Sequence, residues 1–338
     1  MIRALIPALA ALAAWGPASA ADLGSIVDQH ILPAFSTLDT TAKSLDGAAQ
    51  AECAPGDAAL RAAYHDAYDA WMAASHLQIG PLETGELGFA LSFWPDPRGK
   101  TAKTLRRFVL EEDAIVETPA EYATVSVAAR GFPALERMLY DDALQSVGTE
   151  AYRCKLTRAI AADIAATSGK ILAAWSDEHG ALMRSAGASG NAIYPKAEDA
   201  ERKLYTALMT ALEFNAEARV ARPLGTVDRP RPRRAEAWRS GRALKNLRLS
   251  TLALKDLAAR LAPDGRTDVA EPVDAAFEKT MGRIDGLGMA DFDAGGDNQR
   301  WLEIDLLRLE IVKTRNSADE FLGKALGVFV GFNARDGD

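Results

Sequence analysis

The chain has 338 residues, with 39 Lys and Arg against 47 Asp and Glu, and a formal net charge of −8 at pH 7. This acidic balance excludes an overall polycation of the kind that binds nucleic acid. Hydrophobic residues make up 48% and charged residues 25% of the chain, which excludes a disordered or collagen-like protein and is typical of a globular one with a sizeable core.

The first element along the chain, residues 1–20, is predicted to be a secretory signal peptide. A basic residue, Arg3, precedes a short apolar stretch from Ala4 to Trp15, and small residues follow up to Ala20. The stretch is too short to cross a bilayer, which takes about 20 apolar residues, and no later stretch is apolar enough to do so. We therefore expect cleavage after Ala20 and a periplasmic mature protein without a transmembrane segment.

The rest of the chain is predicted to be helical. The whole sequence is rich in alanine, with 66 in 338 residues, and apolar residues after residue 20 recur at spacings of three and four, as in the stripe Leu60, Tyr64, Ala67, Tyr68 and Trp71. Helices of this length need partners along their faces, so we expect an all-α fold of antiparallel helical bundles. The predicted helices cover residues 118–140, 149–179, 196–221, 234–261, 269–287 and 298–332.

Small, flexible residues around 187–191 interrupt the helical pattern. They divide the chain into the signal peptide (1–20), an N-terminal helical bundle (21–190) and a C-terminal helical bundle (191–338). Residues 80–99 and 222–234 are too rich in Pro and Gly for regular structure, and long loops on helical scaffolds tend to carry function.

Two features of the predicted helices mark where they start, stop or bend. Thr118 and Glu121 form a capping box that opens the helix over 118–140, and Gly180 is expected to close the helix over 149–179. Pro133 lies inside the first of these helices, two residues after Gly131. Because proline lacks an N–H and its ring clashes with the preceding turn, this helix must kink or restart there.

The two cysteines, Cys53 and Cys154, are predicted to form a disulfide, since export places them where disulfides persist. A loop of this length would gain up to about 4–5 kcal/mol of stability on the chain-entropy model. The alternative of a metal or catalytic thiol finds no neighbouring His or Cys to support it.

The histidines do not form an obvious metal motif. His65, Asp69, Met72 and His76 share one helix face, but His65 and His76 would lie roughly 16 Å apart along the axis, too far to bind one ion. The common hydrolase and nucleotide-binding signatures, among them HExxH, GxSxG and the P-loop, do not occur. The simpler interpretation of the histidine stripe is a half-exposed helix face.

One segment of the sequence resembles a motif of a known protein family. The stretch GFPALE at residues 131–136 resembles the GxHxxE motif of the imelysin-like family, also called the M75 peptidase family. Residues 80–82 and 93–99 look like a loop of the exported branch of that family, and residues 222–225 and 236–240 look like its second-half signatures. The resemblance implies an all-helical periplasmic or envelope protein of two bundle-like domains, with the motif near their junction. Members include a metallopeptidase and proteins of iron uptake.

The sequence departs from the motif at Pro133, which stands where the histidine would be. A His and a Glu three residues apart on a helix could share one ion, but proline offers no ligand and only Glu136 remains. A zinc site needs three or four protein ligands, so the peptidase interpretation is weakened. The alternative to a ligand site is a helix bend with Glu136 in an ordinary salt bridge to Arg98, Arg137 or Arg239.

We predict a ligand site built from three segments. Glu136 and Asp96 are proposed as acceptors for a cation or a donor-rich ligand, and Arg98 and Arg239 as their electrostatic partners or as clamps for an anion. Glu236 and Ser240 lie on the same predicted helix as Arg239. The loop over 93–99 is stiff, and it has two equally supported roles: it presents Asp96 and Arg98 to a ligand, or it packs as a rigid plug between helices.

A run of arginines adds local positive charge to the acidic chain. Anionic lipid, carboxylate or chelate binding suits the exported compartment better than nucleic acid does. The alternative is a solvated interdomain loop whose arginines pair with the abundant acids. The run comprises Arg219, Arg222, Arg229, Arg231, Arg233, Arg234, Arg239 and Arg242.

These observations favour a non-catalytic periplasmic binding protein linked to metal or iron acquisition. Its ligand would be a metal ion, either a divalent metal or iron, or a small anion or chelate. Two alternatives stay open: an M75-type metallopeptidase in which the fold brings His76 or His179 to Glu136, and an envelope protein that uses its surface to contact a protein partner.

Overall fold

The computed structural model describes residues 21–84, 86–288 and 291–328. These residues fold into helices and connecting loops, with a single β-bridge between Thr226 and Arg229 in place of any strand. The predicted all-α class is confirmed. The predicted signal peptide lies outside the described residues. Within the described parts of the chain, no helix combines the length and apolarity needed to cross a membrane.

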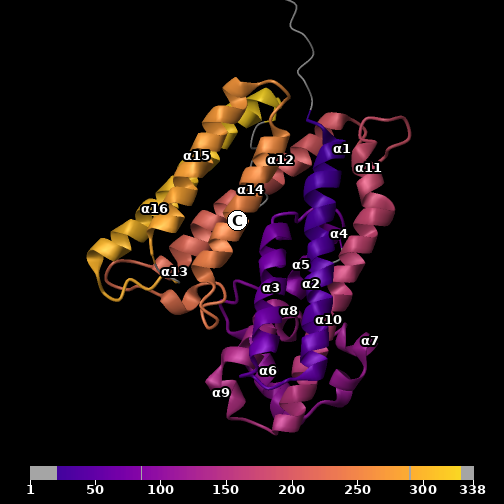
Figure 1. The fold of residues 1–338 in the computed structure, drawn as a ribbon, viewed down its shortest axis with the longest axis vertical. Helices are drawn as coiled ribbons and strands as arrows, with labels where there is room; N and C mark the ends of the chain where they lie inside the picture. Colours follow the sequence, from indigo (N-terminus) through magenta and orange to yellow (C-terminus); the bar gives the residue numbers. More distant parts are fainter. Residues whose placement is uncertain (1–20, 85, 289–290, 329–338) are drawn as a thin grey trace, which may run out of the picture.

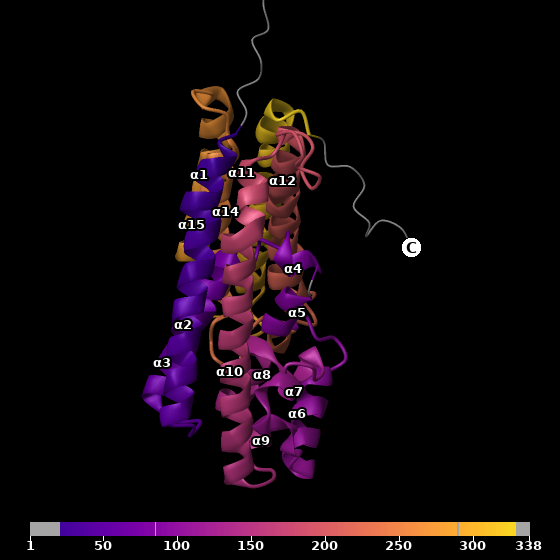
Figure 2. The ribbon, with the colours of Figure 1, turned by 90° about the vertical axis from the view of Figure 1, so that its right-hand side faces the viewer.

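The N-terminal half is built on three long helical rods that lie side by side (Figures 1 and 2). The first rod contains a π-helical segment near its start, and the third contains one near its end. The first rod consists of α1 (Leu23–Ile26), η1 (Val27–Ile31) and α2 (Leu32–Ala51), the second is α3 (Ala58–Ala74), and the third consists of α10 (Glu150–Ala174), η4 (Trp175–His179) and α11 (Gly180–Arg184).

Short helices between α3 and α10 lie against these rods, α4 and α5 near the middle and the others toward the lower end (Figures 1 and 2). Two of them, α4 and α5, fall within residues 80–99, so this segment is less irregular than its Pro and Gly content predicts. The short helices are α4 (Pro81–Thr84), α5 (Leu87–Leu91), α6 (Lys100–Glu111), η2 (Ala114–Glu117), α7 (Pro119–Tyr122), η3 (Val127–Ala129), α8 (Gly131–Tyr140) and α9 (Asp142–Gln145).

The C-terminal half forms a second group of long helices, drawn from salmon to yellow in Figure 1. Its helices are α12 (Ala197–Phe214) with its continuation η5 (Asn215–Ala221) and α13 (Arg222–Leu224), then η6 (Pro232–Arg234), α14 (Ala243–Leu261), α15 (Thr267–Gly286), and α16 (Asn298–Ser317) with η7 (Ala318–Gly323).

The stripe predicted on α3 is buried, as the helical periodicity requires. Leu60, Tyr64, Ala67, Tyr68 and Trp71 are each at most 2% exposed. The helix begins at its N-cap Asp57, whose side chain accepts a hydrogen bond from the amide of Leu60 at 2.7 Å. The apolar face of α3 therefore packs inward over its whole length.

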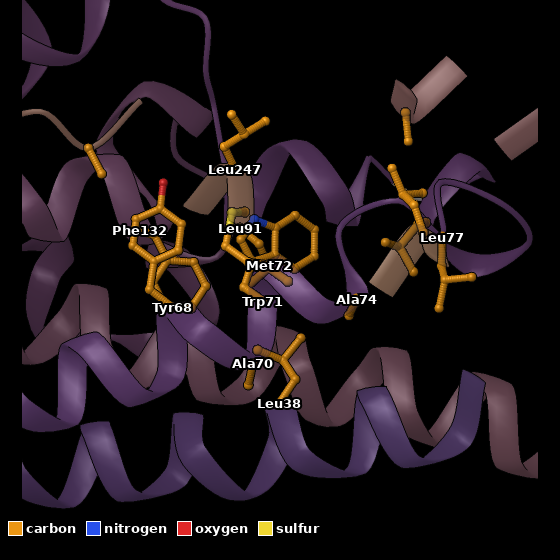
Figure 3. Packing of buried hydrophobic residues seen from close by; sticks show 14 of the residues in the cluster. Leu38, Tyr68, Ala70, Trp71, Met72, Ala74, Leu77, Leu91, Phe132 and Leu247 are labelled. Carbon is orange, nitrogen blue, oxygen red and sulfur yellow. The ribbon is translucent and has the colours of Figure 1, made fainter. Parts of the chain in front are cut away.

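The two halves share one hydrophobic core. Helix α14 of the C-terminal half packs against α3 of the N-terminal half, and Leu247 of α14 belongs to the same buried cluster as Met72 and Trp71 of α3 (Figure 3). The chain passes between the halves through a turn that follows α11, in the region where the boundary at 187–191 is predicted. The division into domains at 190 stays a prediction, because the buried apolar residues of both halves belong to a single cluster.

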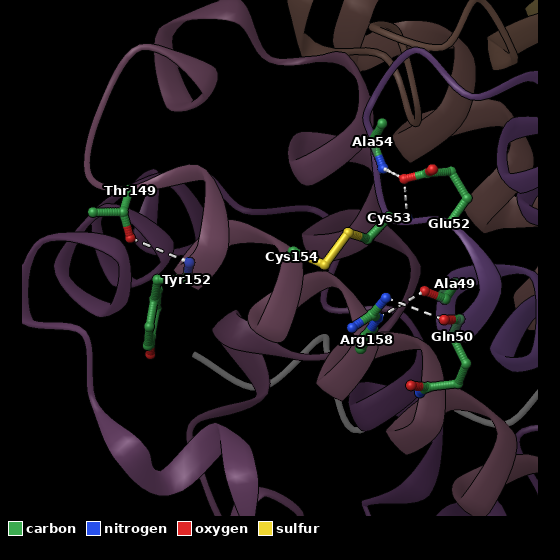
Figure 4. The surroundings of a disulfide bond; sticks show 9 residues. All are labelled: Ala49, Gln50, Glu52, Cys53, Ala54, Thr149, Tyr152, Cys154 and Arg158. Atoms are coloured by element: carbon green, nitrogen blue, oxygen red, sulfur yellow. Dashed lines mark hydrogen bonds between the residues drawn. A yellow bond between two sulfur atoms is a disulfide. The ribbon is translucent and has the colours of Figure 1, made fainter.

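The disulfide between Cys53 and Cys154 is confirmed, with the Cα atoms 5.2 Å apart. It joins the segment that follows α2 to the N-terminal part of α10 (Figure 4). One turn further along α10, Arg158 donates hydrogen bonds to the carbonyl oxygens of Ala49 and Gln50, each at 3.1 Å. The covalent link and these two bonds hold the same pair of helices together.

The helix predicted over 118–140 is instead three separate pieces, α7, η3 and α8. Thr118 precedes α7, but its side chain makes no capping hydrogen bond, so the predicted capping box does not form. The restart occurs at Gly131, whose φ of +72° lies in the left-handed region. A Cβ there would overlap the carbonyl oxygens of Ala90 and Leu91 on α5. Pro133 then occupies the first turn of α8, where a missing N–H costs nothing.

Two other predicted boundaries are wrong. The third rod does not stop at Gly180 but continues through α11 to Arg184. The helix predicted from Arg234 begins only at Ala243, because the chain turns sharply between these residues. Ala237 has a φ of +49° and Gly241 one of +67°, conformations that end a right-handed helix.

Candidate functional site

A pocket of about 320 Å³ lies where the two halves meet. Its walls come from α3, the loop over 93–99 with the start of α6, the first turns of α8, and the segment from α13 to the turn at 235–239. Four aromatic side chains and seven charged ones line it: Tyr68, Phe93, Trp94 and Trp238, with Asp96, Glu136, Arg137, Arg222, Arg233, Arg234 and Arg239. Four of the five segments that carry the family resemblance contribute to this cavity, whereas residues 80–82 do not line it.

Helix α8 brings Glu136 to this pocket. Its start is fixed by Gly131 against α5, and Phe132 stacks on Tyr68 of α3 with the ring centres 4.8 Å apart (Figure 3). Pro133 and Glu136, one turn apart, both line the pocket. The side chain at position 133 therefore faces the cavity, but proline offers no group that could bind an ion there.

The carboxylate of Glu136 is only 5% exposed and is bound by Ser240. Its Oε1 accepts hydrogen bonds from the backbone amide and the hydroxyl of Ser240, both at 2.9 Å. Among the described residues, no group donates to Oε2. These two bonds tie α8 of the N-terminal half to the turn that precedes α14 in the C-terminal half.

Burial raises the pKa of Glu136, although the bonds from Ser240 and the charges of Arg239 and Arg137 oppose the shift. The folded protein therefore holds this proton at pH values where the unfolded chain has lost it. Because the folded state binds more protons in that window, the free energy of unfolding falls as the pH rises through it.

The side chain of Asp96 accepts hydrogen bonds from the backbone at the start of α6. Its Oδ1 accepts from the amide of Lys100 at 2.9 Å and its Oδ2 from that of Thr101 at 2.8 Å, so the carboxylate caps the exposed N–H groups at the start of α6. Burial alone would raise the pKa of Asp96, but these bonds, aided by Arg137, lower it below its usual value. Asp96 is thus an ionised carboxylate with both oxygens engaged.

Asp141, a residue that our sequence analysis did not select, holds two of the arginines. Its Oδ2 lies 2.6 Å from Nη1 of Arg137 and 3.2 Å from Nε of Arg239. Arg239 also stacks over Trp238, with its guanidinium carbon 4.2 Å from the ring centre. Arg137 and Asp141 are four residues apart at the end of α8, and this spacing of opposite charges could have indicated the pair from the sequence.

Three residues of the predicted site are not among the lining side chains. Ser240 still reaches the pocket through its bonds to Glu136, whereas Arg98 and Glu236 lie apart from it. Arg98 is exposed on the loop over 93–99 and is not among the lining side chains. Glu236 is 3% exposed and lies in the core, where its Oε2 binds Nε of Arg219 at 2.8 Å and the amide of Asn246 at 3.3 Å. The structure brings together Glu136, Asp96, Arg239 and Ser240, and it separates Arg98 and Glu236 from them.

The histidines are engaged elsewhere. The ring of His76 contacts His30 through their Nε2 atoms at 2.8 Å, and Nδ1 of His30 lies 2.6 Å from Asp256. His179 contacts the hydroxyl of Tyr194 at 3.1 Å. Neither His76 nor His179 lines the pocket.

These placements test whether the pocket suits a bound metal. Across residues 21–84, 86–288 and 291–328, no group of three or more His, Cys, Asp or Glu side chains is arranged to hold a metal ion. A catalytic zinc takes three protein ligands and an open position, whereas this pocket offers only the free Oε2 of Glu136 and an Asp96 already bonded at both oxygens. The described residues do not fit a zinc centre of that kind.

The chain resembles known proteins in both sequence and structure. The family model for imelysin, peptidase family M75, matches residues 31–307. An imelysin-like protein from Psychrobacter arcticum 273-4 has a similar structure, with 18% identity, a TM-score of 0.74, and coverage of 92% of this chain and 96% of that one. A protein named as an iron-regulated protein A precursor, from Parabacteroides distasonis ATCC 8503, shows 14% identity, a TM-score of 0.69, and coverage of 90% and 94%. No curated protein matches the sequence significantly.

Proposed function

Because the chain belongs to the imelysin family, we propose that it is an exported, non-catalytic binding protein that acts in metal or iron acquisition. Its ligand would occupy the pocket between the two halves. The residues proposed to line the binding site are Glu136, Asp96 and Arg239, with Ser240 holding Glu136 in place.

The observation that carries this proposal is the state of the pocket at Pro133 and Glu136. The position that would supply an imidazole holds a proline, and the one remaining motif carboxylate is already bonded to Ser240 at Oε1. Hydrolysis at a metal needs an ion with an open coordination position, held by about three side chains. A pocket without such a set is better suited to binding than to cleavage.

The cellular context rests on two further observations. One structural neighbour is named as an iron-regulated protein A precursor, which motivates a link to iron for this chain. The signal-peptide pattern of residues 1–20 and the disulfide between Cys53 and Cys154 both suit an oxidising, extracytoplasmic compartment. We propose a periplasmic location, which N-terminal sequencing of the mature protein would test by its expected first residue, Ala21.

An M75-type metallopeptidase is the second candidate, and the family name itself favours it. It would require His76 or His179 to leave its present partner and reach Glu136. Chelator-sensitive cleavage of an unfolded polypeptide that is abolished by Glu136→Ala would establish this activity and overturn the binding proposal.

Calorimetry and elemental analysis test the binding proposal directly. The mature protein, purified from its own periplasm, is analysed for bound metal and then titrated with Fe²⁺, Mn²⁺ and small anions. Glu136→Ala is compared with Glu121→Ala, which alters an exposed glutamate outside the pocket. We expect binding of at least one probe that Glu136→Ala weakens and Glu121→Ala leaves unchanged. Failure of every probe to bind the wild-type protein would contradict the proposal.

A further inference from the structure

The pocket contains an excess of positive charge. Five arginine side chains line it against two carboxylates, a formal balance of +3 in a protein whose overall charge is −8. A cavity lined mainly by one sign of charge concentrates ligands of the opposite sign. The pocket therefore differs in charge from the rest of the molecule.

The negative groups of the pocket already have partners. Both oxygens of Asp96 accept backbone hydrogen bonds, and Oε1 of Glu136 accepts two from Ser240. Asp141 lies next to the pocket and offsets the charges of Arg137 and Arg239. These carboxylates leave little free capacity to attract a cation.

The positive charges of the pocket that have no partner among the described residues are those of Arg222, Arg233 and Arg234. None of the three guanidinium groups donates a hydrogen bond or forms an ion pair with any residue that the structure describes, and the one polar-aromatic contact is that of Arg233 with Trp238 at 5.7 Å. All three line the cavity. An arginine presents a fork of N–H donors that binds a carboxylate through two parallel hydrogen bonds, so these three groups are a ready site for an anion.

The chain keeps these arginines close together although they lie on two short helices. The amide of Arg231 donates to the carbonyl of Pro223 at 2.9 Å, and the bridge between Thr226 and Arg229 closes the loop. Mutual repulsion within this loop lowers the pKa of Arg231, chiefly through Arg234. An anion among these side chains would relieve that repulsion.

The other walls favour an organic anion. Tyr68, Phe93, Trp94 and Trp238 offer apolar faces that suit a carbon skeleton, which inorganic phosphate lacks. The volume of about 320 Å³ is at the lower end for small-molecule pockets, which run from about 300 to 1,000 Å³. The cavity is accordingly sized for a small molecule.

We infer that the pocket binds a small polycarboxylate, free or as the anionic shell of a metal chelate, through Arg222, Arg233 and Arg234. This inference rests on the proposed binding function and specifies the class of ligand. A metal would then arrive enclosed in its chelator, and the pocket would recognise carboxylate groups while offering no coordination sphere of its own.

Titration calorimetry on the mature chain tests the inference with four probes: metal-free citrate, ferric citrate, inorganic phosphate and Mn²⁺ alone. We expect both citrate probes to bind, with an affinity that falls as the salt concentration rises. Arg222→Gln and the double change Arg233→Gln with Arg234→Gln should each weaken citrate binding about tenfold or more. Arg229→Gln, on the same loop but outside the pocket, is the matched control and should bind as the wild type does.

The outcomes separate this inference from the proposed function. Binding of Mn²⁺ that depends on Glu136, with no binding of citrate, would overturn the polycarboxylate ligand and leave the binding function standing. Phosphate binding as tight as citrate binding would also overturn it. Failure of all four probes would overturn both. The salt dependence is measured on the wild-type protein, so the test does not depend on the folding of any variant.

Discussion

The buried ion pair between Arg219 and Glu236 gives a sharp test of how the pocket-forming turn is held. Arg219 on η5 is 5% exposed and Glu236 is 3% exposed, with Nε of the arginine 2.8 Å from Oε2 of the glutamate. Arg219 also donates to Asn215 at 2.6 Å and to Ser250 at 3.2 Å. Replacing it by methionine keeps an unbranched, flexible side chain, although a shorter one, and removes the charge and all of these bonds.

The expected loss of stability follows from what remains around Glu236. In Arg219→Met the buried carboxylate retains, among the residues that the structure describes, only the side-chain amide of Asn246, at 3.3 Å. Removing one partner of a buried pair leaves the other charge buried without a partner, which lowers the free energy of unfolding by about 3–5 kcal/mol. Adding Glu236→Gln removes this unpaired charge, so the double variant should be more stable than Arg219→Met alone.

Urea unfolding followed by circular dichroism, applied to the wild type, both single variants and the double variant, measures the coupling free energy. Arg248→Met is the control, because the pair of Arg248 with Asp285 is exposed and should contribute less than about 1 kcal/mol. A loss of stability in Arg219→Met no larger than in this control, or a double variant less stable than Arg219→Met, would contradict the expected cost of an unpaired buried charge.

Three further changes probe the scaffold and the site. Gly131→Ala should lose about 2–5 kcal/mol, measured by urea unfolding, because the added Cβ meets backbone oxygens at a positive φ; a loss below 1 kcal/mol would contradict this. Cys53→Ser with Cys154→Ser should cost about 2–5 kcal/mol, and reduction of the wild type should give a similar loss in thermal unfolding. Glu136→Gln should gain stability relative to the wild type as the pH rises from acid to neutral, since burial raises the pKa of Glu136 and the amide carries no proton to lose; a difference independent of pH would argue against a raised pKa.

Local patterns in the sequence correctly predicted much of the scaffold. The three- and four-residue spacing of apolar side chains identified the long helices, since that spacing alone decides which face can be buried. The stripe on α3 is buried as expected, and the family resemblance read from GFPALE is confirmed by the family match. The cysteine pair was predicted from the compartment and is bonded.

Local patterns failed where the backbone responds to distant contacts. Residues 234–242 have a helical composition, yet they form a turn in which Ser240 reaches Glu136, 104 positions earlier in the chain. Glu136 and Glu236 were both predicted to belong to the ligand site, but only the first lines the pocket, while the second pairs with Arg219 in the core. The arginine run was also divided, into buried residues such as Arg242 and pocket residues such as Arg222.

The sequence by itself determined that this protein is helical, that the stripe from Leu60 to Trp71 faces the core, and that a proline occupies the motif position where an imidazole would be needed. These properties depend on neighbours within a turn or two of helix. Only the tertiary structure decided which charges remain without partners, because a hydrogen bond or ion pair is set by distances of about 3 Å between residues that lie far apart in the chain. The chemistry of the pocket follows from that pairing.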